Sequence, residues 1–290
     1  ASKTYGDANP SLSATVSGFV NGQTLANSGV SGSGTATTTA TTTSPAGTQL
    51  ITAGVGNLTA TNYDFTNLVD GTLTINKANL TVTPTTGQSK IYGDQDPSLL
   101  TYASLTNQLV GGDTSIAGIT GSLTRAIGET VGNYTYSIGN LSATNYTFTL
   151  APSSSQFNIN PRPITLTATT QSKTYGNADP TLAATITSGS LASVTVSDTL
   201  ADVTGTLTRA AGENVGSYNV ALGTGSKAGN YAIVYPTNNQ AFSITKANLS
   251  HVTASKTYDG LNTVTFGQIG TIAGVNGETF SATAGTAGIS

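Results

Sequence analysis

The feature that most constrains this chain is a repeat with a period of about 83 residues. A Lys-x-Tyr-Gly marker begins at Lys3, Lys90 and Lys173, and Lys256 opens a variant of it, Lys-Thr-Tyr-Asp-Gly. The four lysines are 87, 83 and 83 residues apart. A period of this size indicates a tandem array of similar folded units rather than one large domain.

Two further markers recur in the same order. An Asn-Tyr pair stands at Asn62-Tyr63, Asn145-Tyr146 and Asn230-Tyr231. The segments 75–80, 159–164 and 244–249 each begin with Ile and end with an apolar residue. Because three independent markers share one period, we predict four units: residues 1–77 without an opening strand, 78–161, 162–246, and a truncated unit at 247–290.

The residue pattern within a unit predicts β-strands. Leu80–Thr83 opens the second unit, and Tyr146, Phe148 and Leu150 alternate with threonines. Alternation places bulky residues on one face and hydroxyls on the other, which favours antiparallel sheets with one solvated face. Gly, Asn and Asp clusters mark the turns between strands. Helix is weakly indicated, with single short turns expected at most at 105–110 or 192–196.

The predicted fold class is therefore all-β, with small β-sandwich (Ig-like) or β-grasp-like units arranged as an elongated rod. Linkers between units are almost absent, and prolines at Pro161 and Pro163 stiffen one of them. The chain has 290 residues and no Cys, so packing and sheet hydrogen bonds must hold each unit together.

Composition excludes several classes of function. The formal net charge is -3 and only 10 residues are Lys or Arg, which argues against nucleic acid as a partner. No apolar run reaches the roughly 20 residues of a membrane span. The sequence starts at Ala1 without a signal peptide, so an internal piece of a longer protein is expected.

No residue pattern points to catalysis, and no catalytic, cofactor-binding or metal-binding residue is assigned; ligand-binding residues stay unknown. The single His251 has no triad partner, and a packing role is the simpler interpretation. No phosphate loop or zinc-protease motif is present. The expectation is a protein that is not an enzyme and has no cofactor.

Three polar patterns leave alternatives open. The turn pairs Asp7/Asn9, Asp94/Asp96 and Asn177/Asp179 fit Asx-turns or, less simply, calcium sites. The pairs Arg125/Glu129 and Arg209/Glu213 fit hairpin salt bridges or, with a nearby Lys and Asn, isopeptide chemistry. The tyrosines fit core packing or a sugar-binding platform.

The motif Lys-x-Tyr-Gly-(Asp/Asn)-x-(Asp/Asn)-Pro-x-Leu stands at Lys3–Leu12, Lys90–Leu99 and Lys173–Leu182. The second and third units continue with Leu-Thr-Arg-Ala at 123–126 and 207–210, where the first unit has Gly34-Thr35-Ala36-Thr37. This pattern resembles the MBG repeat of the YGX type, and Tyr258-Asp259-Gly260 is similar to the YDG repeat.

The resemblance implies tandem repeats of filamentous-haemagglutinin-like bacterial surface adhesins. It implies a secreted, extracellular or cell-surface location and a spacer or stalk role in cell attachment or biofilm matrix. The expected partners are neighbouring repeats of the same parent chain, with extracellular polysaccharide or a host or neighbouring cell surface as candidates. Two alternative functions stay open: a glycan- or matrix-binding repeat module, and a self-assembling filament subunit with strand donation between chains.

Overall fold

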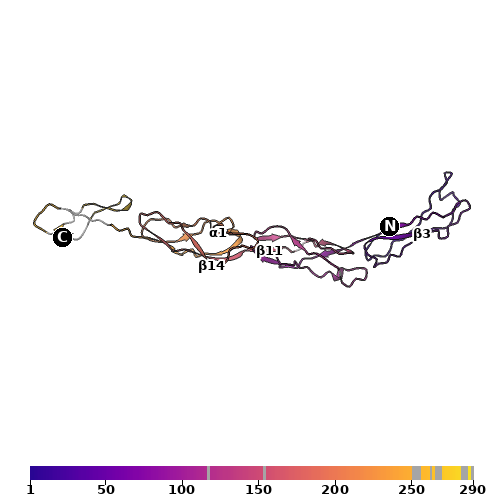
Figure 1. Cartoon of the computed structure of the whole chain (residues 1–290), viewed down its shortest axis with the longest axis horizontal. Coiled ribbons are helices and arrows are strands. Elements are labelled where there is room, and N and C mark those ends of the chain that lie inside the picture. The colour runs from indigo at the N-terminus through magenta and orange to yellow at the C-terminus, as the bar shows by residue number, and fades with distance from the viewer. Residues whose placement is uncertain are drawn as a thin grey trace. The chain divides into compact units, whose positions relative to one another are not determined.

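In the computed structural model of the chain, strands dominate every repeat (Figure 1). The structure describes residues 1–115, 118–152, 155–249, 256–261, 263–264, 270–281 and 287–288. Two compact units are distinguished by their internal contacts. The N-terminal unit comprises Ala1–Lys90, Asp96–Gly128 and Gly132–Ile159, and the C-terminal unit comprises Ile91–Gln95, Glu129–Val131 and Asn160–Ser290. The all-β array predicted from the sequence is confirmed.

The elements follow the repeats defined above. The first repeat forms β1 (Ser2–Thr4), β2 (Thr35–Thr37), β3 (Gly47–Gly54) and β4 (Gly71–Asn76). The second forms β5 (Ala78–Val82), β6 (Ser89–Ile91), η1 (Thr106–Gln108), β7 (Thr124–Arg125), β8 (Gly132–Tyr134), β9 (Tyr136–Ser137), β10 (Tyr146–Leu150) and β11 (Phe157–Asn160).

The third repeat has the most complete set of strands. It forms β12 (Arg162–Ala168), β13 (Gln171–Thr174), β14 (Ala184–Gly189), α1 (Leu200–Thr204), β15 (Thr208–Arg209), β16 (Gly216–Tyr218), β17 (Val220–Ala221), η2 (Ala228–Asn230), β18 (Tyr231–Val234) and β19 (Phe242–Thr245). The described part of the fourth forms β20 (Thr263–Val264), β21 (Ile272–Ala273), η4 (Val275–Gly277), β22 (Thr279–Phe280) and β23 (Ala287–Gly288).

One sheet is common to the first three repeats, and we call it the closing sheet because it contains each repeat's last strand. Its strand orders are β1-β4-β3-β2 in the first repeat, β6-β11-β8 in the second and β13-β19-β16 in the third. In each repeat the last strand (β4, β11 or β19) lies between two others. One neighbour is the strand of the Lys-x-Tyr-Gly marker (β1, β6 or β13), and the other is β3, β8 or β16. The same three positions in the sequence therefore build the same sheet three times.

A second sheet, here called the opening sheet, contains the first strand of a repeat. In the third repeat, β12 lies between β14, antiparallel, and β18, parallel. In the second repeat, β5 pairs in parallel with β10. The opening strands Leu80–Thr83 and 162–168 thus pair with the Asn-Tyr strands, as register positions Tyr146↔Ala78 and Tyr231↔Arg162 show.

The prediction of antiparallel sheets was wrong for these pairs. The pairs β1–β4, β5–β10, β12–β18 and β13–β19 are parallel. Parallel pairing requires a crossover of a dozen or more residues, and each of these pairs is separated by more than 60 residues of chain. Alternation of side chains is the same for both pairings, so it does not reveal strand direction.

The short helical segments also differ partly from prediction. The turn expected at 105–110 forms η1, but 192–196 is not helical, and α1 begins instead at Leu200. Thr199 caps α1: its hydroxyl accepts from the Asp202 N–H while the Asp202 carboxylate accepts from the Thr199 N–H. The Thr-x-x-Asp pattern at 199–202 is the sequence signal for this helix start, and the expectation of a turn at 192–196 did not take it into account.

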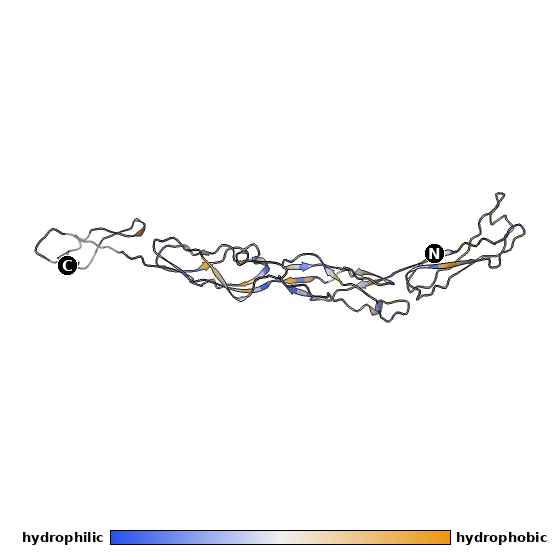
Figure 2. Ribbon diagram, in the orientation of Figure 1, coloured by the Kyte–Doolittle hydropathy of each residue, from blue (hydrophilic) through white to orange (hydrophobic). Residues whose placement is uncertain are grey.

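The cores are small and lie where the strands of one repeat meet. In the third repeat, Phe242 and Ile244 of β19 pack with Ala168 and Val220. Phe157 in the second repeat is likewise fully buried. Burial of such a ring stabilises the repeat by about 1.5–3 kcal/mol. Figure 2 shows apolar and polar residues next to one another on the same strands, as expected for sheets with one buried face.

Within the described residues, no helix is long and apolar enough to cross a membrane.

Candidate functional site at the repeat boundaries

The Tyr-Gly turn of the first repeat contacts the second repeat. Tyr5 is 3% exposed, and its ring meets the Tyr146 ring edge-on with centroids 5.5 Å apart. Both phenols donate to one carboxylate oxygen, Asp113 Oδ2, over 3.1 Å from Tyr5 and 2.8 Å from Tyr146. An edge-on pair of tyrosines sharing an acceptor combines apolar burial with directional hydrogen bonds.

The glycine after Tyr5 is required by the same contact. Gly6 has a φ of +90°, and a Cβ built there would lie 2.6 Å from the Val110 side chain. Both the backbone conformation and the close approach of the next repeat therefore exclude a side chain. The Tyr-Gly marker therefore docks against the next repeat. The Tyr5 ring packs on Tyr146, and the Gly6 backbone packs on Val110.

The arrangement recurs in the C-terminal unit, to which the turn Ile91–Gln95 belongs. Tyr92 is 2% exposed and meets the Tyr231 ring edge-on at 5.5 Å. The Tyr231 hydroxyl donates to Asp198 Oδ2 over 2.7 Å. Gly93, with a φ of +80°, lies against Ala192 so closely that a Cβ would collide with it. The contact at the second boundary therefore repeats the edge-on tyrosine pair, the Asp acceptor and the close-packed glycine of the first, although the residue against the glycine is Ala192 instead of Val110.

Arg162, the first residue of β12, adds a further contact at the second boundary. Its guanidinium donates from Nε to the Tyr92 carbonyl over 2.8 Å and pairs with the Asp94 carboxylate. The opening strand of the third repeat thus holds the Tyr-Gly turn that precedes it.

At the third boundary the same turn meets a different partner. The Tyr175 hydroxyl donates to the Glu278 carboxylate, and a Cβ on Gly176 would lie 2.9 Å from the Val275 side chain. The positive φ of the glycine is kept, but Glu278 takes the place of the Asp acceptor and the Tyr ring that the first two boundaries have. This agrees with the departure of the fourth repeat from the other three in sequence.

The Asn of the Asn-Tyr marker also contacts the preceding repeat. Asn145 Oδ1 accepts from the Ala46 N–H over 3.1 Å, and Asn230 Oδ1 accepts from the Val131 N–H over 3.0 Å. Ala46 and Val131 each lie in the repeat before the Asn that they contact. Two of the three sequence markers are therefore two halves of one recurring contact.

Asp113 and Asp198, which sequence reasoning did not single out for this role, are the acceptors at the centre. Each precedes the receiving Tyr by 33 residues, and that shared spacing was the available signal. Asp198 is fully buried and also pairs with Lys227, whose Nζ lies 2.6 Å from Oδ1. A buried carboxylate without such partners would be costly, so these donors are needed for the contact to form.

The environment shifts the pKa values of these groups. Burial and the Asp113 carboxylate raise the pKa of Tyr5, and mainly burial raises that of Tyr146 to about 12. Burial alone would raise the pKa of Asp198, but hydrogen bonds from Lys227, Tyr231 and Tyr92 outweigh it and hold that pKa below its usual value. At neutral pH the tyrosines stay protonated donors and Asp198 stays an anionic acceptor.

These tyrosines are unsuited to the sugar-platform hypothesis. Tyr5, Tyr92, Tyr146 and Tyr231 are all less than 7% exposed, so their ring faces are covered by protein. They are buried, as the packing alternative expects, but at the contacts between repeats, which the sequence did not predict.

A second recurring cluster lies inside the repeats. Arg125 donates two hydrogen bonds to the Asp96 carboxylate, from Nε over 2.7 Å and from Nη2 over 2.8 Å. Lys90 Nζ lies 2.7 Å from the same carboxylate. In the third repeat Asp179 lies between Lys173 and Arg209, each 2.6 Å away. Each guanidinium also stacks near two aromatic rings at 5.0–5.3 Å. Bidentate ion pairs backed by aromatic faces are among the stronger polar contacts.

The predicted Arg209–Glu213 salt bridge is confirmed, and Glu213 also contacts Lys173. Lys173 donates hydrogen bonds to the Asp179 and Glu213 carboxylates, and these raise its pKa and so keep it an ammonium. Isopeptide formation needs a neutral amine beside an amide, whereas this ammonium contacts two carboxylates. The geometry therefore favours the salt-bridge interpretation.

The acidic turns are occupied in a similar way. Asp96 and Asp179 bind cationic side chains, and the side chain of Asp7 accepts from the Thr4 N–H, three residues before it, which is not the geometry of an Asx-turn. No group of three or more His, Asp or Glu side chains is placed to hold a metal in the described part of the chain. The carboxylates of Asp94, Asp96 and Asp179 already have cationic partners. His251 lies outside the described residues.

The first repeat lacks both the Asp and the Arg of this cluster. Asn9 stands where the other repeats have Asp96 and Asp179, and Ala36 stands where they have the Arg. The Asn9 amide donates to the Ala40 carbonyl, and Lys3 donates to the carbonyls of Asp7 and Thr41. Because the Asp and the Arg are lost together, neither leaves the other without a partner, and backbone carbonyls take the place of the carboxylate at the buried Lys3 ammonium.

Comparison with protein-family models decides what these repeats are. The model for the MBG domain of the YGX type matches residues 1–74, 80–154 and 164–243. The chain belongs to the MBG family. MBG repeats occur in adhesin-like surface proteins, consistent with a structural repeat module. No curated protein and no solved structure matches the chain.

For this MBG chain, the recurring boundary contact gives physical meaning to the residues that name the type. The Tyr and Gly of the YGX turn do not form a pocket for a small ligand. They bind the next MBG repeat. The similarity of the fourth segment to the YDG type stays a prediction.

Proposed function

We propose that this chain is a spacer segment in the stalk of a secreted, cell-surface adhesin, without enzymatic activity. A spacer must pass mechanical load from one repeat to the next, and a contact between consecutive repeats is the element that does so. The observation that carries the proposal is the docking of Tyr5 and Tyr92 against Tyr146 and Tyr231 of the following repeats. Two consecutive boundaries built in the same way are expected of a structural array.

The absence of cysteine allows a direct test. Cysteines introduced at Leu50, 60% exposed in β3, and Val234, 62% exposed in β18, can carry two spin labels or dyes. A spacer should give one narrow distance distribution, unchanged when calcium is replaced by chelator. A wild-type distribution as broad as that of the denatured chain would refute the proposal.

Variants connect the distance measurement to the boundaries. Tyr5→Ala and Tyr92→Ala remove the inserted rings and should broaden the distribution. Tyr258→Ala, at a tyrosine 90% exposed, is the matched control and should leave it unchanged. Circular dichroism on each variant separates a loosened boundary from an unfolded repeat.

The cell-surface part of the proposal needs its own test. An antibody raised against this chain should label intact cells that produce the parent protein. Labelling seen only after the cells are permeabilised would contradict an extracellular spacer.

A further inference from the structure

Tyrosine is the main side chain of this protein that an oxidant can attack. The sequence holds 12 Tyr and no Cys, Met or Trp, and Cys and Met are otherwise common targets of oxidation. Among the described residues, two pairs of tyrosine rings are in contact: Tyr5 with Tyr146, and Tyr92 with Tyr231. Both pairs lie at boundaries between consecutive repeats.

The first pair brings the reactive ends of its two rings together. The ring centroids are 5.5 Å apart with the planes at 80°, and both hydroxyls donate to Asp113 Oδ2. Because the two phenol oxygens converge on a single atom, the ring carbons next to those oxygens converge as well. These ortho carbons carry much of the unpaired electron density of a tyrosyl radical. The positions at which two tyrosines couple therefore lie at the same end of the pair.

The second pair has the same arrangement within the C-terminal unit. Its ring centroids are also 5.5 Å apart, with the planes at 73°. Tyr231 donates to the Asp198 carboxylate, and Tyr92 hydrogen-bonds the same side chain. Two rings can pack without hydroxyl groups, whereas buried hydroxyls need an acceptor. The recurrence of both the hydroxyls and the shared carboxylate points to a chemical role for the phenols.

We propose that these two boundaries are sites of oxidative cross-linking between tyrosines, driven by a one-electron oxidant such as a peroxidase with peroxide. One electron leaves each ring, and each phenol proton passes through the carboxylate to solvent. The two radicals form a carbon–carbon bond between their ortho positions, and the hydrogens of those carbons move to the phenol oxygens. The product is a dityrosine, and the two electrons and two protons that are lost reduce peroxide to water.

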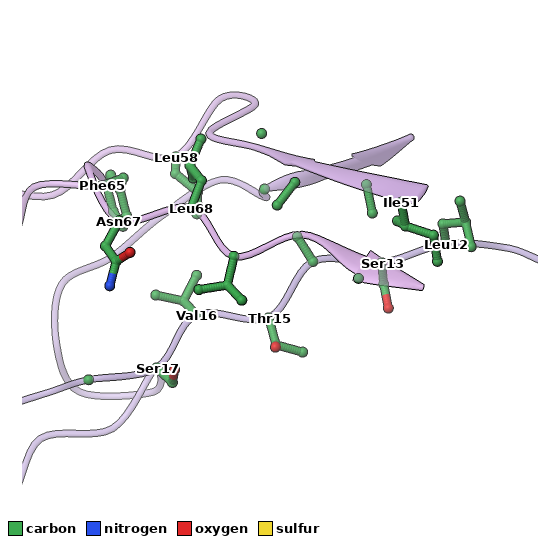
Figure 3. A pocket seen from close by; sticks show the side chains of 18 of the residues that line it. Leu12, Ser13, Thr15, Val16, Ser17, Ile51, Leu58, Phe65, Asn67 and Leu68 are labelled. Atoms are coloured by element: carbon green, nitrogen blue, oxygen red, sulfur yellow. The ribbon is translucent and has the colours of Figure 1, made fainter. Parts of the chain in front are cut away.

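The oxidant does not need a pocket beside the rings. Tyr5 and Tyr146 are 3% and 4% exposed, so each keeps a small contact with solvent, and an electron has only a thin layer of protein to cross. The groove of ≈ 820 Å³ in the first repeat, which Figure 3 shows from close by, has no tyrosine in its lining. An oxidant held in that groove would therefore not contact either pair.

The cross-link turns a docked boundary into a covalent one. A bond between residues of consecutive repeats restricts the unfolded chain in the way that a disulfide does, in a protein that has no Cys. The inference goes beyond the spacer function because it adds a covalent modification. Failure of the cross-linking test would leave the spacer proposal standing, since that proposal depends on docking alone.

The test uses the full chain, illuminated briefly with ruthenium tris(bipyridine) and persulfate, which takes up the electrons and becomes sulfate. The monomer is separated from cross-linked dimers, digested with trypsin and examined by mass spectrometry. The first site should join the peptide 4–77 to 126–173, and the second should join 91–125 to 228–246. Each bond removes two hydrogens, a loss of about 2 Da. A monomer with dityrosine fluorescence but without either linked pair would overturn the proposal.

Phenylalanine variants connect the fluorescence to the boundaries. Tyr5→Phe keeps the ring and removes the hydroxyl, so it should abolish the first linked pair and lower dityrosine fluorescence by about half, because the two boundaries are distant and independent. Tyr175→Phe is the matched control. Tyr175 lies in the same turn of the third repeat and donates to Glu278, but no second tyrosine ring contacts it among the described residues. Equal fluorescence in the two variants would contradict coupling at the first boundary.

A second variant and an unfolded control keep the result independent of folding. Circular dichroism shows whether Tyr5→Phe folds, and Tyr146→Phe removes the other hydroxyl of the same pair with the same expected loss. Wild-type chain oxidised in denaturing urea should give linked peptides at many tyrosines instead of at two sites. The same two linked pairs in the native and the unfolded chain would show that the boundary contact does not direct the coupling, and would overturn the assignment.

Discussion

The first and third repeats share the closing sheet and differ in the rest of the core. In the third, β12 completes an opening sheet, and Lys173, Asp179 and Arg209 form an ionic cluster in which the two cations are buried and the carboxylate is partly exposed. In the first, Asn9 and Ala36 replace the Asp and the Arg of that cluster. Both nevertheless place a Tyr-Gly turn against the next repeat. The boundary contact is therefore independent of how the interior is completed.

The largest difference between the two repeats is expected for core truncation. Leu166→Ala in β12 removes a fully buried side chain that packs in the completed sheet, and it should lower the free energy of unfolding by about 2–5 kcal/mol. Val16→Ala in the first repeat, where the side chain is only half-buried, should cost less than about 1 kcal/mol. Urea titrations of both variants measure this, and equal costs would mean that Val16 is as well packed in solution as Leu166.

A smaller effect is expected at the turn that both repeats share. Gly6→Ala combines an unfavourable φ of +90° with a collision against Val110, for about 2–4 kcal/mol in total. Gly18 has the same φ with open space around it, so Gly18→Ala should cost only about 1 kcal/mol. Thermal unfolding of the two variants isolates the contact between repeats. Similar melting temperatures would show that Tyr5 is not docked.

The carboxylates of Asp113 and Asp198 should stabilise the fold by different amounts, and the contribution of Asp198 should depend on pH. Asp198→Asn removes a charge that Lys227 and Tyr231 contact, and should cost about 1–3 kcal/mol at pH 7. The folded pKa of Asp198 is depressed, so this stability is present above the unfolded value of 3.8 and is lost as the pH falls through the lower folded pKa.

Asp113→Asn is the comparison at the boundary of the first repeat. Asp113 accepts from two neutral phenols, and hydrogen bonds from neutral donors are weaker than those from an ammonium. Its cost at pH 7 should therefore be smaller. Denaturant titrations at pH 7 and pH 3 test both variants, and an Asp198→Asn cost that does not shrink in acid would contradict the depressed pKa.

The smallest effect is spectroscopic. The pKa of Tyr146 is raised to about 12, so its stabilising contribution is complete below pH 10 and is lost as the pH rises through about 12. Absorbance of tyrosinate should show a late phase to which Tyr146 contributes together with Tyr231 and other buried tyrosines, so Tyr146→Phe should lower its amplitude. Tyr258→Phe, at an exposed ring, should leave that amplitude unchanged. An amplitude that Tyr146→Phe does not lower would contradict the raised pKa of Tyr146.

The sequence alone determined the repeat, its period and its strands. Strands β5 and β10 form where alternation predicted them, because burial of one face imposes a period of two on any strand. The family followed from the Lys-x-Tyr-Gly motif and is confirmed by the match to three repeats. The predicted unit boundaries and the elongated shape stay predictions.

Only the tertiary structure decided which markers meet. Tyr5 and Asp113 are 108 residues apart, and no local pattern relates them, so their hydrogen bond depends on how one repeat contacts the next. The parallel direction of β12 and β18 was hidden for a similar reason, since side-chain alternation is the same in both directions. Local periodicity reports burial, whereas contacts between distant residues are fixed by packing of the whole chain.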